Sequence, residues 1–388
     1  MKNILYICNK DPRIITGGNE QRTNLLWKAL QKLGNVYTIV YNDTVDEKQE
    51  LVGDINPIYN VPIKEAYYNH TVKGIAYAIL YRIMGFCVLP YKYPNEYNPA
   101  KLYSDVKFDI VVTRYAHSAT RYHLWEIAPI FVDIDDHPVQ VYETVKQSKL
   151  PCIFRPLFKK ILFKQYKSFI NKISGGWIAN KEQSGDGGKI SFLPNIPFMP
   201  SEKYDAYNVE RSYLFTIGAM TYGPNRDGVD RFLSEIWPAF HEKYPNINYV
   251  IGGKGVPKQM VEKWNRIDGV KYVGFIDDLE GAYKKCYATI VPIYAGGGTC
   301  IKTLESLAHS RVCLSTRFGA RGLNAKANTN IGLLVFNDTV SFIKAFEEIQ
   351  NNIRLINLET QAKMFVINEY STEIFNRIVL ETIKKNIC

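Results

Sequence analysis

The chain has 388 residues, 46% of them hydrophobic and 22% charged, which is typical of globular proteins and excludes a disordered or fibrous chain. The length predicts two α/β domains of roughly 150–200 residues each, and no segment approaches the roughly 18–20 uncharged residues of a membrane-spanning helix. The net charge of +10 favours an anionic partner, but no recognition motif predicts nucleic acid. Seven scattered cysteines without CxxC or Cys/His clusters predict a reducing, cytoplasmic location and neither a disulfide framework nor a zinc site.

The N-terminal half begins with a βαβ pattern, which predicts a parallel sheet with helices on its faces. A buried strand, rather than a signal peptide, is expected at residues 4–7, followed by a glycine-containing loop, a helix at 22–33 and a strand at 36–41. The pair Gly17 and Gly18 lies in this loop, where α/β sheets bind phosphates, so it is a candidate phosphate loop. Further strands are expected at residues 110–112, 130–132 and 176–179.

Two stretches of this half, residues 81–93 and 154–167, are both basic and aromatic. The second has helical apolar spacing with lysines in between, a pattern typical of a helix that lies on an anionic membrane surface. The same pattern also fits a helix packed on the core with its lysines in solvent.

A second series of alternating strands and helices predicts another doubly wound domain. Residues 197–211, rich in Pro, Ser, Glu, Lys and Asp, are the expected interdomain linker, and residues 351–385 are helical by periodicity. The strands are expected at residues 213–218, 249–251, 270–273, 288–291, 312–315 and 332–335.

The glycine run Gly296–Gly298 follows the strand predicted at 288–291 and precedes a helix that begins near Thr299. Helix N-termini favour anions, and glycines let a phosphate approach the backbone. Lys302 and Glu305, three residues apart, would place a cation near the phosphates and a carboxylate that accepts ribose hydroxyls. The run therefore predicts a nucleotide diphosphate site; a glycine-rich turn followed by a surface Lys–Glu pair is the alternative.

Residues 291–323 resemble the donor-binding motif of retaining glycosyltransferases of family 4, in the branch that reads GGGTxIKxLEALA followed by GA(E)GL. The loop at Gly218, the strand end at Gly274 and the tail at 368–375 resemble further segments of that family. The resemblance implies the GT-B fold, an α/β architecture of two Rossmann-like doubly wound domains facing across a cleft. It implies an N-terminal acceptor-binding domain at 1–198, a C-terminal nucleotide-sugar-binding domain at 207–365 and a helix at 366–388 that crosses back to the first domain.

The resemblance also implies residue roles. Glu305 would hold the ribose of the nucleotide, and the amides of residues 297–299 would hold the diphosphate. Gly18 would approach the diphosphate from the opposite domain, and Gly274 would contact the base through its backbone. The donor-binding residues expected in all are Gly17, Gly18, Gly218, Arg226, Gly274, Gly296, Gly297, Gly298, Thr299, Lys302 and Glu305.

Three departures from the family's pattern limit this transfer. Gly297 stands where most members have a glutamate that contacts the donor sugar, so the pattern does not identify the sugar. Ala219 and Asn225 stand where an Arg and a Lys usually clamp the diphosphate, and Cys300, expected as a small packing residue, replaces the arginine of GGGTRIK. The basic residues that could supply the missing charge are Arg226, Lys254 and Lys302.

Acidic residues end the strand predicted at 130–132. In the resembled family this strand end faces the acceptor, and Asp135, beside His137, could orient the acceptor hydroxyl or stabilise charge on the reacting sugar. Asp133-Ile134-Asp135 also has the Asp-x-Asp spelling of a metal site in GT-A glycosyltransferases, but the downstream donor motif works without metal, so neither a metal nor a cofactor is expected. Alternatively, the acids cap the following helix.

We therefore predict a glycosyltransferase (EC 2.4) with Asp135, His137 and Lys302 as catalytic residues. It would move a sugar, with retention of configuration, from a nucleotide-sugar donor to a glycan or lipid-linked acceptor in bacterial surface polysaccharide synthesis. It would act in the cytoplasm, at the inner face of the membrane if the basic stretch binds anionic lipid. The alternatives are a nucleotide-sugar epimerase and a non-catalytic nucleotide-sugar-binding protein; a nicotinamide dehydrogenase lacks support because no GxGxxG with a later acid follows a strand.

Overall fold

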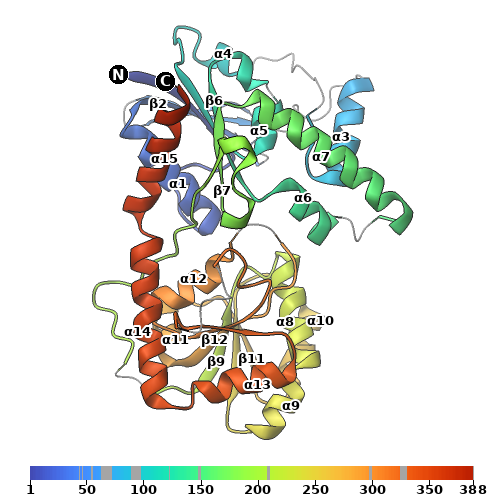
Figure 1. The fold of residues 1–388 in the computed structure, drawn as a ribbon, viewed down its shortest axis with the longest axis vertical. Helices are drawn as coiled ribbons and strands as arrows, with labels where there is room; N and C mark the ends of the chain where they lie inside the picture. The colour runs from blue at the N-terminus through green and yellow to red at the C-terminus, as the bar shows by residue number, and fades with distance from the viewer. Residues whose placement is uncertain are drawn as a thin grey trace. The chain divides into compact units, whose positions relative to one another are not determined.

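The protein is described by a computed structural model (Figure 1). The described residues are 1–42, 44–45, 47–53, 56–62, 72–88, 98–121, 123–146, 150–207, 210–296, 299–323 and 330–387. The chain divides into two compact units: unit 1 comprises Met1–Asn195 together with Thr372–Cys388, and unit 2 comprises Ile196–Ser371.

Unit 1 is built on a sheet of order β3-β4-β2-β1-β5-β6-β7-β8, in which β3 pairs antiparallel with β4 and the other neighbours pair in parallel. Central strands read as unbroken apolar runs because helices cover both faces, and Ile4–Cys8 is fully buried. The strands are β1 (Lys2–Cys8), β2 (Gly34–Asn42), β3 (Gln49–Leu51), β4 (Ile58–Pro62), β5 (Ile110–Arg114), β6 (Ile130–Asp135), β7 (Gly175–Ile178) and β8 (Ile190–Phe192).

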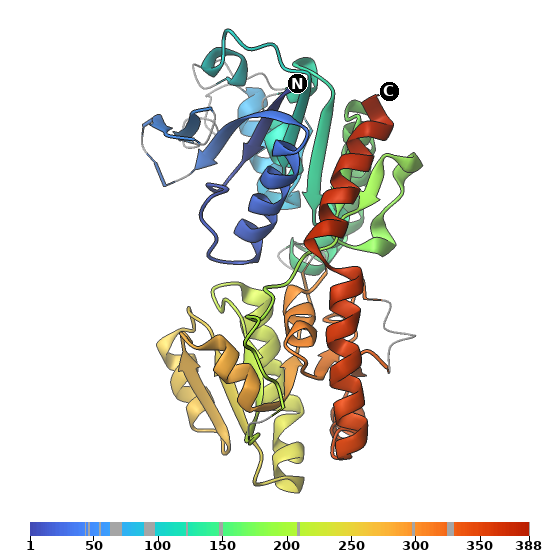
Figure 2. The same ribbon diagram turned by 90° about the vertical axis from the view of Figure 1, so that its left-hand side faces the viewer.

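The longer helices of unit 1 cover this sheet, and the last one comes from the end of the chain. That helix, α15 (Thr372–Ile387), packs against α1 (Gly18–Gln31) and β7 (Figures 1 and 2). The other helices are α3 (Val72–Met84), α4 (Pro99–Leu102), α5 (Ala116–Arg121), α6 (Pro138–Val141) and α7 (Arg155–Lys172), with short turns η1 (Leu124–Glu126), η2 (Tyr142–Lys146), η4 (Cys152–Phe154), η5 (Lys181–Gln183) and η6 (Asp186–Gly188).

Unit 2 has a fully parallel sheet of order β11-β10-β9-β12-β13-β14. Its first strand therefore lies between the second and the fourth, and the chain winds outward from β9 in both directions. The strands are β9 (Tyr213–Ile217), β10 (Asn248–Gly252), β11 (Val270–Gly274), β12 (Cys286–Val291), β13 (Cys313–Thr316) and β14 (Leu333–Phe336). The helices are α8 (Gly223–Glu235), α9 (Trp237–Lys243), α10 (Lys258–Asn265), α11 (Leu279–Lys285), α12 (Ile301–Ala308), α13 (Thr339–Glu348) and α14 (Asn352–Glu369).

The observed elements confirm the predicted α/β architecture of two doubly wound sheets. Each strand expected from the sequence is present within two or three residues of its predicted bounds. The helix expected at 22–33 begins earlier, at Gly18, and ends at Gln31. The strands β3, β4 and β8 were not predicted: β3 and β8 are edge strands of three residues, and the five residues of β4, between β2 and β3, are interrupted by Asn60. None of the described helices combines the length and hydrophobicity needed to span a bilayer.

Candidate active site

The best candidate site of unit 2 lies at the carboxyl edge of its sheet, between β9 and β12. These neighbouring strands lead into helices that belong to opposite directions of winding, and ligands of open α/β sheets bind at such a switch point. Gly218 follows β9, whereas residues 292–296 follow β12 and lead toward α12. The topology therefore brings together two loops that are far apart in the sequence.

Lys302, in the first turn of α12, lies directly over Gly218. A Cβ added at Gly218 would be 2.3 Å from the Lys302 Cε and 3.3 Å from its Nζ, so any larger residue would displace the ammonium group. Gly218 is also crowded by the next loop, since a Cβ at Gly253 would be 1.7 Å from the Gly218 carbonyl oxygen. The absence of a side chain at Gly218 thus leaves room for Lys302 at the end of β9.

Glu305, one turn further along α12, is buried with 8% exposure. Burial raises the pKa of its carboxyl group to about 7, although the Lys302 ammonium opposes this shift. Its backbone carbonyl accepts a hydrogen bond from His309 Nδ1 at 2.7 Å. Within the described part of the chain, neither the Glu305 carboxylate nor the Lys302 ammonium has a hydrogen-bond or ion-pair partner, so both can take a ligand.

Gly296 brings a further cation to this edge. Its φ of 131° is a glycine conformation, and a Cβ there would be 3.2 Å from the Tyr222 hydroxyl and 3.5 Å from the Arg321 Nη2. Sequence reasoning missed Arg321; the available signal was an arginine where the GA(E)GL pattern has its bracketed glutamate. Thr299 is buried at the start of α12, whereas Gly297 and Gly298 lie outside the described residues.

The structure separates the three basic residues that were candidates to replace the usual diphosphate clamp. Lys302 contacts Gly218, but Arg226 pairs with its exposed neighbour Asp227 at 3.1 Å. The Lys254 ammonium lies 4.0 Å from the centroid of the Phe275 ring, next to Gly274, which has a φ of 70° and open space around its Cβ position.

Two of the substituted positions have structural roles. The Asn225 side-chain amide donates to the Ala219 carbonyl at 2.7 Å and closes the turn after β9. Cys300 is buried and precedes the first residue of α12, in agreement with its expected packing role.

In unit 1 the acidic strand end is part of a buried ion-pair network. Asp133 is fully buried and accepts hydrogen bonds from Arg22 and Arg114, both of which are also buried. The two guanidinium groups outweigh burial and hold the pKa of Asp133 below its usual range. Arginines bind both carboxylate oxygens of Asp133. Asp133 is therefore not available as a metal ligand of an Asp-x-Asp site.

The network continues to the surface through Arg114. Its Nη2 donates to Asp135 Oδ2 at 3.1 Å and to Asn19 Oδ1 at 2.9 Å. Asp135 and Tyr115 both have positive φ, at 63° and 66°, which is strained for non-glycine residues. Asn19 belongs to the first turn of α1, which starts at Gly18 after the extended Gly17. The structure thus brings the Gly17–Gly18 loop and Asp135 together.

His137 caps the helix that follows this strand. Its Nδ1 accepts from the Val139 N–H at 3.2 Å, so the cap is the histidine and not one of the acids.

A cavity of about 330 Å³ opens beside the same strand ends. Aromatic and polar groups face each other in it: the rings of Tyr115 and His117 are stacked at 5.4 Å between centroids, with Tyr81 6.1 Å from His117. It is lined by Asn9, Tyr81, Met84, Gly85, Phe86, Tyr115, Ala116, His117, Ile134, Asp136, Pro138 and Val141.

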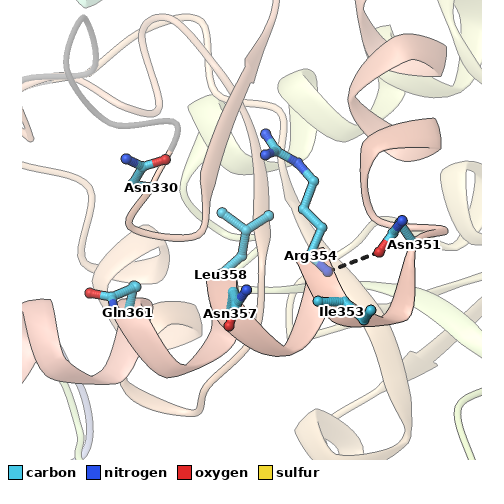
Figure 3. A pocket seen from close by; sticks show the side chains of 7 residues that line it. All are labelled: Asn330, Asn351, Ile353, Arg354, Asn357, Leu358 and Gln361. Atoms are coloured by element: carbon cyan, nitrogen blue, oxygen red, sulfur yellow. Dashed lines mark hydrogen bonds between the residues drawn. The ribbon is translucent and has the colours of Figure 1, made fainter.

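A larger hollow of about 650 Å³ lies elsewhere in unit 2, along the first turns of α14 (Figure 3). Asn351 and Arg354 face it, but the hydrogen bond between them serves as the N-cap of α14. Its lining includes neither Lys302 nor Glu305, so we do not assign the site to it.

Known proteins share this architecture. Solved structures with high similarity include sucrose-phosphate synthase from Thermosynechococcus elongatus, with a TM-score of 0.70, 13% identity and coverage of 99% of both chains. Another is the UDP-forming α,α-trehalose-phosphate synthase from Burkholderia vietnamiensis, with a TM-score of 0.68, 10% identity and coverage of 100% of this chain and 98% of that one. The fold is GT-B.

Sequence comparisons match unit 2 to a family model and most of the chain to one relative. Residues 211–352, which include Gly218, Lys302 and Glu305, match the family model of the glycosyl transferases group 1. An uncharacterized 44.6 kDa protein in the cps region of Klebsiella pneumoniae is 22% identical over 335 residues, covering 82% of this chain and 84% of that protein.

Proposed function

We propose that the chain is a glycosyltransferase that moves a sugar from a nucleotide-diphosphate-sugar donor to a glycan or lipid-linked glycan, with retention of configuration. One observation carries the proposal: at the switch point of unit 2, Lys302 lies over Gly218, and Glu305 is buried one turn further along the same helix, both without partners in the described residues. This is the part of the chain that matches the glycosyl transferases group 1.

In this proposal unit 2 binds the donor. The Glu305 carboxylate accepts hydrogen bonds from the two ribose hydroxyls, and the base lies near Gly274. The N-terminus of α12 binds the diphosphate, because the first N–H groups of a helix favour anions, and Thr299 lies just before it. Lys302 and Arg321 neutralise the diphosphate charge, the role of the Arg–Lys clamp in the resembled family. Arg226 keeps its pairing with Asp227.

The proposed reaction breaks the bond between the sugar C1 and the β-phosphate oxygen, and forms a bond between C1 and the acceptor oxygen on the same face. The departing phosphate oxygen takes the acceptor's proton. Lys302 would stabilise the charge that develops on that oxygen, so the protein contributes mainly positioning and electrostatic stabilisation. No covalent intermediate and no metal are part of the proposal.

We assign the acceptor to unit 1, in the cavity beside Asp135 and His137. Stacked aromatic rings such as Tyr115 and His117 can pack against sugar rings, and Asp136 can accept hydroxyl hydrogen bonds there. The relative in a cps region supports a role in surface polysaccharide synthesis. Action at the inner face of the membrane is a further part of the proposal.

Two assays test the proposal. Isothermal titration with UDP, GDP and dTDP should identify one nucleotide that binds; absence of binding by all three would overturn the donor site. Incubation of the matching sugar donors with membrane extract should release nucleoside diphosphate only when acceptor is present. A changed nucleotide sugar without release would indicate an epimerase, and binding without either reaction would indicate a non-catalytic protein.

A further inference from the structure

Helix α7 has an unusual charge composition. Its eighteen residues, Arg155–Lys172, include six basic side chains and no acidic one. One side of the helix is buried in unit 1 through Leu162, Tyr166 and Phe169. Packing against the core of unit 1 therefore explains the apolar residues on only one side of α7.

The opposite side of α7 exposes large apolar residues among lysines. Leu157 and Phe163 are 55% and 49% exposed. They share one helical face with Lys160, Lys164 and Lys167, since each of these positions lies three or four residues from another member of the set. We call these five residues the basic face. The turn just before the helix adds the exposed side chains of Ile153 and Phe154.

The lysines of the basic face are largely uncompensated. Lys160 and Lys164 have no ion-pair partner in the described residues, and the Lys167 ammonium lies 4.7 Å from the centroid of the Phe163 ring. The neighbouring Lys159, outside the basic face, pairs with Glu143. The basic face thus combines positive charge with half-exposed apolar side chains.

Helix α3, which contacts α7, has a similar stripe. Val72, Ile75, Ile79 and Arg82 are exposed and recur at three- and four-residue intervals. Two other residues of α3, Tyr81 and Met84, line the unit 1 cavity. Helix α6, which also lines this cavity, packs against α7 as well (Figure 1).

We propose that the basic face of α7 docks on the surface of an anionic lipid bilayer. Leu157 and Phe163 would enter the interfacial region while the lysines contact lipid phosphates, the arrangement of amphipathic helices that lie in the membrane plane. A nucleic acid would also attract the lysines, but it gives no reason for exposed aliphatic and aromatic residues between them. Because α7 contacts two walls of the cavity, docking brings this cavity close to membrane-anchored molecules.

Flotation of the full-length protein with lipid vesicles tests the proposal without any sugar donor, so its outcome is independent of the proposed transfer. The protein should bind vesicles of 70% phosphatidylcholine and 30% phosphatidylglycerol and not vesicles of phosphatidylcholine alone. The triple variant Lys160→Gln/Lys164→Gln/Lys167→Gln should bind the anionic vesicles about a hundredfold more weakly, given about fivefold for each basic residue near such a surface.

A matched control distinguishes the effect of the basic face on vesicle binding from the effect of net charge. Lys258→Gln/Lys344→Gln/Lys384→Gln removes three exposed lysines from α10, α13 and α15 and should bind as the wild type does. Leu157→Ser/Phe163→Ser, which keeps all lysines, should weaken binding and leave the circular dichroism spectrum unchanged. Equal binding by the two triple variants would overturn the proposal, as would a wild type that binds duplex DNA but not the anionic vesicles.

Discussion

At the carboxyl edge of the unit 1 sheet, two arginines and two aspartates are bonded to one another, whereas at the same edge of the unit 2 sheet Lys302 and Glu305 have no partner in the described residues. Asp133 binds Arg22 and Arg114 inside the protein, so its charge is compensated before any ligand arrives. Glu305 is nearly as buried, but its carboxylate is left for a ligand.

Buried charged groups therefore have different roles in the two units. A paired network such as that of Asp133 fixes the local structure, because removal of one member leaves the others desolvated and unpaired. An unpaired carboxyl group such as that of Glu305 costs folding free energy and shifts its pKa, and such groups concentrate at functional sites.

The largest effect is expected from Asp133→Ala. Arg22 and Arg114 would remain buried without a counter-charge, which typically costs about 3–5 kcal/mol of unfolding free energy. Urea denaturation measures this loss. The control Asp227→Ala removes an exposed aspartate that pairs with Arg226 and should cost less than about 1 kcal/mol. A loss for Asp133→Ala as small as the control's would show that the network is not structural.

Glu305→Ala should affect binding rather than folding. Loss of two hydrogen bonds to a charged group predicts a decrease of about 2–4 kcal/mol in nucleotide binding, or roughly 30- to 1,000-fold in affinity, by calorimetric titration. At pH 8 the unfolding free energy should not fall, because the variant removes an uncompensated buried carboxylate. Glu242→Ala, on the exposed side of α9, is the matched control. Unchanged affinity in Glu305→Ala would contradict the donor site.

The cations of the unit 2 edge should differ in their contributions. Lys302→Met and Arg321→Met should each weaken nucleoside diphosphate binding about tenfold to a hundredfold, since each removes a charge-assisted contact with phosphate. Arg226→Met removes an equal charge from the exposed pair on α8 and should leave the affinity unchanged. The reverse order of effects would assign the phosphate contact to α8 instead of α12.

The pKa of Glu305 predicts a smaller, pH-dependent effect. The carboxyl group is protonated below about 7, and only its ionised form accepts both ribose hydroxyls, so affinity should rise about tenfold between pH 6 and pH 8. The ligand-free protein should lose stability from this group as pH rises through the same pKa, because its raised value favours the protonated folded state. The affinity of Glu305→Gln, measured over the same pH range, should lack this tenfold rise. Identical pH dependence of affinity in both proteins would refute the assignment of the titration to Glu305.

Local patterns in the sequence predicted much of the fold and part of the candidate site. Apolar runs such as residues 4–7 and 130–132 indicated buried strands, and the glycine run with Lys302 and Glu305 indicated a phosphate-binding turn before a helix. These signals are local because strand burial and helix initiation depend on neighbouring residues. The pairing of side chains was not predictable in this way: the helix cap is His137, not an acid, and Asp133 is bound by arginines from α1 and β5.

The sequence by itself therefore determined the α/β class, the order of most strands along the chain and the position of the glycine-rich turn. Only the tertiary structure decided that Lys302, rather than Arg226 or Lys254, lies over Gly218, and that Arg321 lies beside Gly296. The physical reason is the strand order. Placing β9 next to β12 joins loops that are distant in the chain, and no local periodicity encodes which side chains meet there.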